Sequence, residues 1–225
     1  MVLSYSDIYD IIEVERGDFM KFDMSCKVFS IVFTKLLKSY YSKHFPDMAI
    51  KDNVKAIKKE YKAMILRTPS LSKDNKMAGN LKGAAYFFAI AKIMPNMTPS
   101  LMDEMVTESM KSDFMVKLHK KKKETGALFS EKSQNTMARD AIRSQRSNDE
   151  MDWCYTYTKG KDEIKYDITK CGVKRLAERE GLLDYLPCMC HMDYPKYEIQ
   201  GAKLDRTKTL ANGDECCNFH LIRMK

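Results

Sequence analysis

The residues of this chain that could do chemistry gather in its last third. Six of the seven cysteines follow position 150, and Cys190 is followed three residues later by Asp193. On a helix, a thiol and a carboxylate at this spacing lie on one side. Such a pair could attack an electrophilic carbon, with Cys190 as the nucleophile and Asp193 as the general base.

A second thiol, Cys217, is expected on a strand, with its side chain on the same face as Phe219. It could be a nucleophile on a rigid element, activated by Asp214 or by a histidine. The alternative is a small core residue, because buried cysteine is common. Asp214 follows Gly213 in a predicted turn, where turn chemistry alone favours aspartate. We therefore rank Asp193 above Asp214 as the general base.

Arg206 is predicted to share a strand face with Leu204 and Leu210. Arginine is unusual on an apolar face unless it is paired. Because its guanidinium can hold a carboxylate through two hydrogen bonds, Arg206 is the best candidate for binding a substrate carboxylate. An internal ion pair is the alternative. Thr209, on the opposite face, is a weaker candidate for substrate binding.

A zinc ion is the competing chemistry. The ligands that zinc prefers are available here as Cys171, Cys188, Cys190, His191, Cys216, Cys217 and His220. Their spacing is poor for a tetrahedral site, since no Cys-x-x-Cys or His-x-x-x-His pair occurs. On the last predicted strand, Cys216 and His220 face away from Cys217. We therefore expect no metal cofactor, and zinc stays open as an alternative.

The elements that must position these residues change character along the chain. In the first half, apolar residues recur every three or four positions, which is typical of helices. The pattern predicts helices over residues 22–40, 50–64, 81–94 and 102–118, a loop over 123–130 and a polar helix over 131–145.

After position 150 the apolar period becomes two, which indicates strands. Strands are predicted at 151–157 and 164–169, and again at 204–210 and 217–221, with Asn212-Gly213 as the turn of the second hairpin. Between the hairpins we expect a helix capped by Gly181 and one or two short helices over 182–200.

Helices followed by antiparallel strands predict an α+β fold, in which a helical N-terminal half packs with a sheet of two β-hairpins separated by helices. We expect a helical region over 1–148 and an α+β region over 149–225, joined in one continuous globular unit.

Composition excludes several classes of protein. No apolar run approaches the roughly 18 residues that span a bilayer, and acidic residues stand where a signal peptide would be basic: Asp7, Asp10, Glu13 and Glu15. We expect a cytoplasmic protein with reduced thiols and no membrane partner. The net charge of +8 includes a basic run, Lys120 to Lys123. Because no aromatic residues interleave with it, we expect no nucleic-acid partner. A homo-oligomer paired through the helix at 22–40 stays open.

Several residues of the last third stand in an order typical of one family. The most specific piece is Thr209-Leu-Ala-Asn-Gly-Asp-Glu-Cys-Cys-Asn-Phe219. Looser pieces are Trp153, Asp167 with Cys171, Cys190-His-Met-Asp193 and Arg206-Thr-Lys-Thr209. From about Trp153 to Phe219, the chain resembles the L-2-amino-thiazoline-4-carboxylic acid hydrolase family.

The resemblance implies a small-molecule substrate and hydrolytic opening of a 2-amino-thiazoline ring to a carbamoyl-cysteine. It implies a catalytic set of Cys190, Asp193, Cys217 and Asp214, and a substrate-binding set of Arg206, Thr209, Trp153 and Cys171. The chain departs from the family pattern in having Asn218 where an acid is expected and extra thiols at Cys188 and Cys216. The layout is also similar to 4-vinyl reductase-type domains, so small-molecule binding without catalysis is the alternative function.

Overall fold

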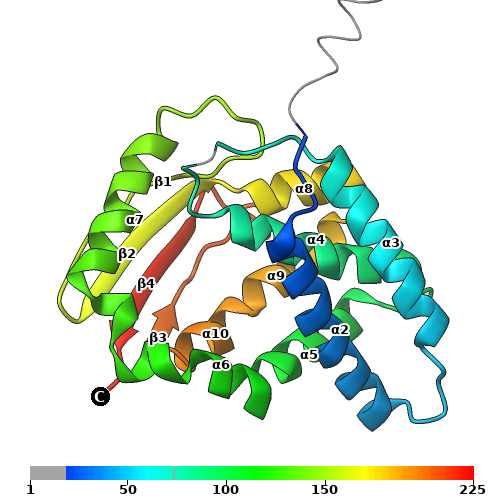
Figure 1. The fold of residues 1–225 in the computed structure, drawn as a ribbon. Helices are drawn as coiled ribbons and strands as arrows, with labels where there is room; N and C mark the ends of the chain where they lie inside the picture. Colours follow the sequence, from blue (N-terminus) through cyan, green and yellow to red (C-terminus); the bar gives the residue numbers. More distant parts are fainter. Residues whose placement is uncertain (1–18, 73) are drawn as a thin grey trace, which may run out of the picture.

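The computed structural model describes residues 19–72 and 74–225. The four acidic residues near the N-terminus that argued against a signal peptide lie outside the described residues. Figure 1 shows helices along the first part of the chain and the strands of one sheet along the last part. This order confirms the predicted α+β fold.

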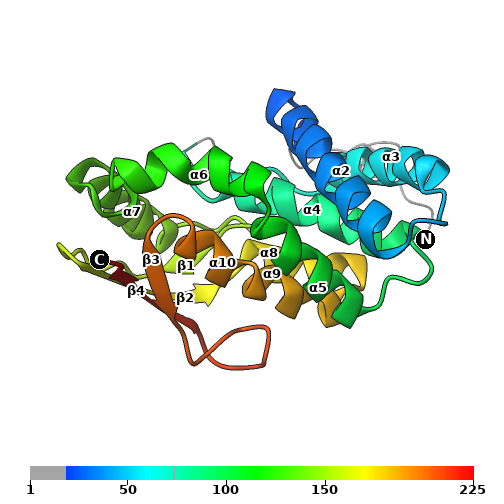
Figure 2. The ribbon, with the colours of Figure 1, turned by 90° about the horizontal axis from the view of Figure 1, so that it is seen from below.

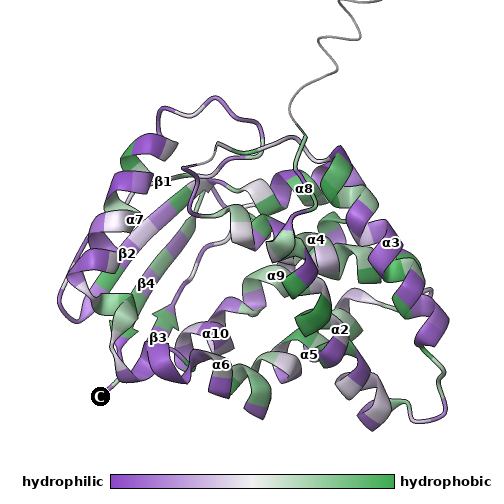
Figure 3. Cartoon of the chain, in the orientation of Figure 1, coloured by the Kyte–Doolittle hydropathy of each residue, from purple (hydrophilic) through white to green (hydrophobic). Residues whose placement is uncertain are grey.

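Six helices come before the first strand in the described part of the chain. They are α2 (Met24–His44), α3 (Lys51–Arg67), α4 (Ala78–Ile93), α5 (Pro99–Met110), α6 (Asp113–Glu124) and α7 (Glu131–Ser144). The first three and the last match the predicted helices. Figure 3 shows both hydrophobic and hydrophilic colour around α3 and mainly hydrophilic colour along α7.

The prediction of a single helix over 102–118 was wrong, because the chain forms α5 and α6 there. Ser112 separates them with an extended backbone, and its hydroxyl oxygen accepts the N–H of Met115 at 3.4 Å. A serine that satisfies a first-turn N–H in this way starts a new helix. Met110 and Met115 on either side are both buried, so the apolar period continues across the break.

The four strands of the described residues form one antiparallel sheet in the order β1-β2-β4-β3. Their bounds are β1 (Cys154–Tyr155), β2 (Glu163–Lys170), β3 (Ala202–Asp205) and β4 (Cys217–Arg223). The two predicted hairpins are β1–β2 and β3–β4, joined by the pairing of β2 with β4, in which Ile168 lies opposite Cys217. Cys217, Phe219 and Leu221 are buried on one face, as predicted.

The second hairpin differs from the prediction in its connection. The strand expected over 204–210 ends at Asp205, and residues 206–216 form a long loop that contains the Asn-Gly turn. The Asn218 side chain accepts the N–H groups of Thr207 and Lys208 at 3.1 and 2.7 Å. A side chain that takes the backbone donors of a neighbouring segment competes with strand pairing, which explains the early end of β3.

Helix α7 lies against β1, whereas a layer of short elements lies between the sheet and the helices α2 and α3 (Figures 1 and 2). This layer consists of α8 (Gly172–Glu180), the 3₁₀ turn η2 (Leu183–Tyr185), α9 (Leu186–His191) and α10 (Asp193–Glu198). Gly181 caps α8 in the left-handed conformation, with φ of 69°, as predicted. The buried side chains of β2, which are Ile164, Tyr166 and Ile168, belong to the same core as this layer.

One buried carboxylate ties the N-terminal helices to this layer. Glu180, at the end of α8, is 6% exposed and accepts hydrogen bonds from Arg67 of α3 at 2.8 and 2.6 Å and from Lys92 of α4. The cations outweigh the cost of burial and lower the pKa of Glu180, so its charge is kept. Among the residues that the structure describes, no helix has the length and apolar character needed to cross a membrane.

Candidate active site

Arg206 lies at the centre of the candidate site, directly after β3. Its side chain is only 1% exposed. One guanidinium nitrogen, Nη1, donates to Asp193 Oδ2 at 3.2 Å, and Nη2 donates to the carbonyl oxygen of Cys190 at 2.8 Å. The buried Nε finds no partner in the structure. Arg206 thus forms the internal ion pair that the sequence left as the alternative, and both Arg206 and Leu210 lie in the loop after β3, not on the strand predicted for them.

Two aromatic rings cover the guanidinium of Arg206. Its central carbon lies 4.7 Å from the centre of the Phe219 ring and 5.1 Å from that of Tyr194. A buried cation gains from such contacts with the faces of aromatic rings. Phe219 belongs to the family-like motif, so the motif supplies part of the wall around the cation.

Asp193 begins α10 and lies between two cations. Its Oδ2 faces Arg206, and its Oδ1 accepts from Lys196 Nζ at 2.9 Å. Burial favours the neutral form of Lys196, but the Asp193 carboxylate outweighs it and raises the lysine pKa. Sequence reasoning missed Lys196, although its place three residues after Asp193 was a usable signal.

Three thiols belong to the same cluster, because Cys171, Cys190 and Cys217 lie close enough to Asp193 for its negative charge to raise their pKa values. Burial raises the pKa of Cys171 to about 11. Burial, and then the negative Asp193, raise the pKa of Cys190. Burial also raises the pKa of Cys217, opposed by the N–H of Leu210, which donates to its sulfur at 3.2 Å. These three thiols are neutral at pH 7.

Two tyrosines that the sequence analysis did not single out contact each other in the same region. The hydroxyls of Tyr166, on β2, and Tyr197, on α10, lie 2.6 Å apart. The Tyr166 ring stacks on Phe219 at 4.4 Å between centres. The burial of Tyr166 was predictable from the alternation along β2, but its partner Tyr197 had no signal in the sequence.

Asp214 and Thr209 organise the loop between β3 and β4. The Asp214 carboxylate accepts the backbone N–H of Thr209 at 2.7 Å, and the carbonyl of Thr209 accepts the N–H of Asp214 at 3.2 Å. This reciprocal pairing is typical of turn aspartates. The structure thus places Asp214 in the role that turn chemistry alone would give it.

Trp153 lies before β1 and is 3% exposed. Its ring packs against Gly172 at the start of α8, so closely that a Cβ added to Gly172 would come within 2.9 Å of a ring atom. Trp153 therefore helps to fix the position of α8, and Cys171 immediately precedes that helix.

Comparison with known families identifies the family to which the chain belongs. The family model of L-2-amino-thiazoline-4-carboxylic acid hydrolase matches residues 79–221 of the 225-residue chain. The chain belongs to this family. No curated protein and no solved structure matches it.

The match to the L-2-amino-thiazoline-4-carboxylic acid hydrolase family extends well beyond the last third that the motifs covered. It begins in the first turn of α4 and ends in β4, and it leaves α2 and α3 outside. The matched region contains the whole Arg206–Asp193–Lys196 cluster and the three thiols. At the family level, the chain is related to hydrolases.

Of the zinc ligands considered in the sequence, Cys171, Cys190 and Cys217 lie at this site, whereas three others have partners elsewhere. Cys188 donates to the carbonyl of Pro99 at 3.2 Å, His191 pairs with Asp103, and His220 pairs with Glu163. Over residues 19–72 and 74–225, one group of three histidine, cysteine or acidic ligand atoms lies within 4.8 Å, and it consists of other residues.

Two shallow depressions on the described surface lie away from the cluster. One of about 290 Å³ lies against α2 and α3 and includes Phe22 and Ile31. The other, of about 320 Å³, lies beside α7 and includes Phe129 and Gln134. Neither is lined by Arg206, Asp193 or the clustered thiols, and the Arg206 side chain is only 1% exposed, so the candidate site is closed at the guanidinium.

The raised thiol pKa gives a prediction about alkaline pH. A free thiol has a pKa of about 8.5, whereas that of Cys171 is about 11 in the folded chain. The unfolded chain therefore loses this proton first, and the stability that Cys171 contributes below pH about 8.5 is lost as the pH rises towards 11. We expect Cys171→Ala to lose less unfolding free energy than the parent between pH 7.5 and 10, measured by urea denaturation. Equal losses in both proteins would contradict it.

Proposed function

We propose that the chain hydrolyses a small cyclic amidine that carries a carboxylate, of the 2-amino-thiazoline-4-carboxylate type, and releases a carbamoyl-cysteine. Membership of the L-2-amino-thiazoline-4-carboxylic acid hydrolase family supports the reaction class. The observation that supports these residues as the site is the carboxylate of Asp193, held between the buried cation of Arg206 and the partly exposed cation of Lys196.

In the proposed reaction, water adds to the ring carbon that is bonded to sulfur and two nitrogens. Asp193 takes a proton from the water as the carbon–oxygen bond forms. That proton passes to the ring nitrogen as its double bond to the carbon becomes a single bond. The carbon–sulfur bond then breaks while the added hydroxyl gives up its proton to become the carbamoyl oxygen, and the sulfur takes up a proton to leave as the free thiol. We assign Lys196, which is hydrogen-bonded to Asp193, as the donor of the proton that the sulfur takes up.

Direct attack by water is favoured over attack by a cysteine of the chain. A nucleophilic cysteine reacts as its thiolate, and burial raises the pKa of Cys190 and Cys217 in the folded protein. Arg206 favours the thiolate of both residues, but burial and the negative charge of Asp193 outweigh it, so both pKa values remain raised. We therefore assign the thiols to the wall of the site and the base to Asp193.

Arg206 is the proposed anchor for the substrate carboxylate. Its Nε has no partner in the closed structure, which leaves one donor of the guanidinium free for a ligand. Because the side chain is 1% exposed, substrate can reach it only if part of the surrounding structure moves. The 206–216 loop, which carries Arg206 at its first position, is the segment that we propose to open.

The experiment is mass spectrometry of L-2-amino-thiazoline-4-carboxylate incubated with the purified protein, once as prepared and once after treatment with a chelator. A product heavier by one water in both samples supports the site described above. Product only without chelator would move the chemistry to a metal. No product, combined with stoichiometric binding of the compound, would support a binding protein without turnover.

Three variants then assign the residues. We expect Asp193→Asn to abolish turnover, and Cys190→Ser and Cys217→Ser to keep most of it, since these thiols are not the base in this scheme. Loss of turnover in either serine variant, with the fold intact by circular dichroism, would return the nucleophile to that cysteine. Turnover by Asp193→Asn at the parent rate would remove the proposed base.

A further inference from the structure

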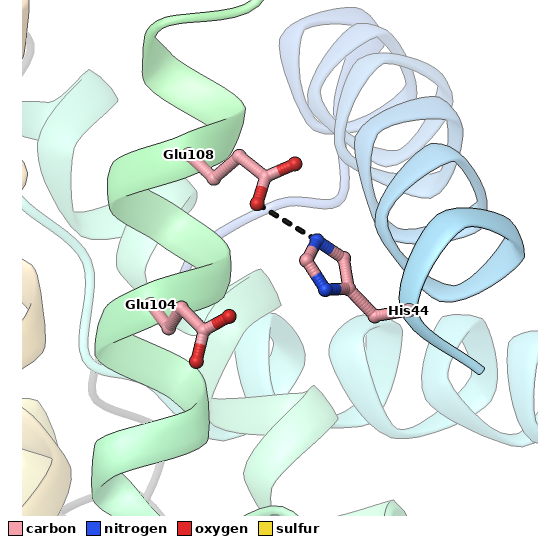
Figure 4. A group of neighbouring side chains, drawn as sticks. All are labelled: His44, Glu104 and Glu108. Carbon is pink, nitrogen blue, oxygen red and sulfur yellow. Dashed lines mark hydrogen bonds and ion pairs between the residues drawn. The ribbon is translucent and has the colours of Figure 1, made fainter.

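A second set of polar side chains meets where the end of α2 contacts α5 (Figure 4). His44 is the last residue of α2, and Glu104 and Glu108 lie one turn apart on α5. One ligand atom from each residue lies within 4.8 Å of the other two. The ring nitrogen Nε2 of His44 is 2.8 Å from Glu108 Oε2.

The surroundings hold the imidazole and the carboxylates in place. The His44 ring stacks on Tyr40 of the same helix, with ring centres 4.4 Å apart and an angle of 26° between the planes. On the other side, Lys43 donates to Glu108 Oε1 at 2.7 Å and lowers the pKa of that carboxylate. Glu108 Oε2 remains directed at His44, so its two oxygens have separate partners.

The cluster is open to solvent. The side chains of His44 and Glu108 are 28% and 36% exposed, so an ion could enter and keep water molecules in its remaining positions. Three protein ligands with open positions for water are common around a bound metal ion. One imidazole with two carboxylates suits a divalent ion such as Mn²⁺, Fe²⁺ or Zn²⁺ better than soft Cu⁺.

We propose that His44, Glu104 and Glu108 form a binding site for a divalent transition-metal ion. The bound ion would join two helices that differ in their relation to the family, because α5 lies inside the family-matched region and α2 lies outside it. A bound ion would therefore fasten the additional N-terminal helix to the family core. The site does not depend on the proposed hydrolase activity and contains none of its residues.

The test is titration of Mn²⁺ into the reduced, chelator-stripped protein at pH 7.5, following the loss of the free-ion electron paramagnetic resonance signal. Mn²⁺ is the probe because thiolates suit softer metals, so the seven cysteines compete little for it. We expect saturable binding with one ion per chain. His44→Gln and Glu104→Gln should each weaken it at least about tenfold, since losing even an outer-shell partner costs that much.

Two further variants separate a metal site from a surface ion pair. His220→Gln is the matched control, because His220 also contacts one glutamate, Glu163, at 2.9 Å but forms no group of three ligand atoms within 4.8 Å among the described residues. It should leave binding unchanged. Lys43→Gln should tighten binding, because it removes the cation that competes for Glu108. A binding curve without saturation in the parent would overturn the proposal, and so would equal affinities of the parent, His44→Gln and Glu104→Gln.

Discussion

Replacement of Asp193 by asparagine is expected to destabilise the protein by about 3–5 kcal/mol, besides abolishing the proposed turnover. Arg206 is 1% exposed, and Asp193 is the only carboxylate paired with it among the described residues. Without that carboxylate, a buried guanidinium keeps its charge and loses its counter-ion. Urea denaturation at pH 7.5, monitored by circular dichroism, measures the difference.

Two comparisons make the Asp193 prediction specific. Asp103→Asn removes an acid from an exposed pair with His191, and exposed pairs contribute at most about 1 kcal/mol. The double variant Asp193→Asn with Arg206→Met removes both charges and should recover much of the stability but none of the turnover. A double variant as unstable as Asp193→Asn alone would show that the unpaired charge is not the cause.

Replacement of Trp153 by alanine is expected to cost about 3–5 kcal/mol, the range for deleting a buried aromatic ring. The ring is 3% exposed and packs on Gly172, so its loss leaves a cavity beneath the start of α8. Because Cys171 and α8 are positioned from there, turnover should fall together with stability. Thermal unfolding and the mass-spectrometric assay, run on the same samples, measure both quantities.

Trp153→Phe distinguishes packing from substrate contact. A phenylalanine fills part of the space, so we expect an intermediate loss of stability and nearly parental turnover. If the indole instead touches substrate, as the family resemblance implies, the KM of Trp153→Phe would rise while its unfolding free energy stayed close to that of the parent.

The sequence predicted the fold where burial has a strong period. Buried and more exposed residues alternate along β4, with Cys217 and Phe219 on the buried face, and they alternate along its partner β2 as well. This two-residue period of apolar side chains predicted the strands of the sheet. The helices with regular apolar stripes, α2 and α3, were predicted for the same reason. In these segments the spacing of the apolar residues indicates directly which face of the helix or strand is buried.

The sequence failed where a single side chain redirects the backbone. Ser112 ends one helix and starts another without interrupting the apolar period, so periodicity could not reveal it. Asn218 takes the N–H groups of Thr207 and Lys208, and this shortens β3 although the residues after it alternate as in a strand. Both depend on a local hydrogen bond that competes with the regular pattern.

The candidate site was predictable in its residue types but not in its pairings. An arginine among apolar residues indicated a buried partner, and Asp193 was already a candidate, yet nothing in the spacing joined positions 193 and 206. Their contact requires α10 to pack beside the end of β3, which is a tertiary arrangement. The raised pKa of the thiols likewise follows from burial that only the folded chain shows.

The strand order has a consequence for how the protein is made. β4 comes after the other three strands in sequence but lies between β2 and β3 in the sheet. During synthesis, β1 and β2 can therefore pair first, while β2 keeps one unpaired edge and β3 has no partner strand until residues 217–223 have been added. Such edges invite association between nascent chains. Ribosomes stalled before residue 217 should thus yield chains that depend on chaperones to stay apart.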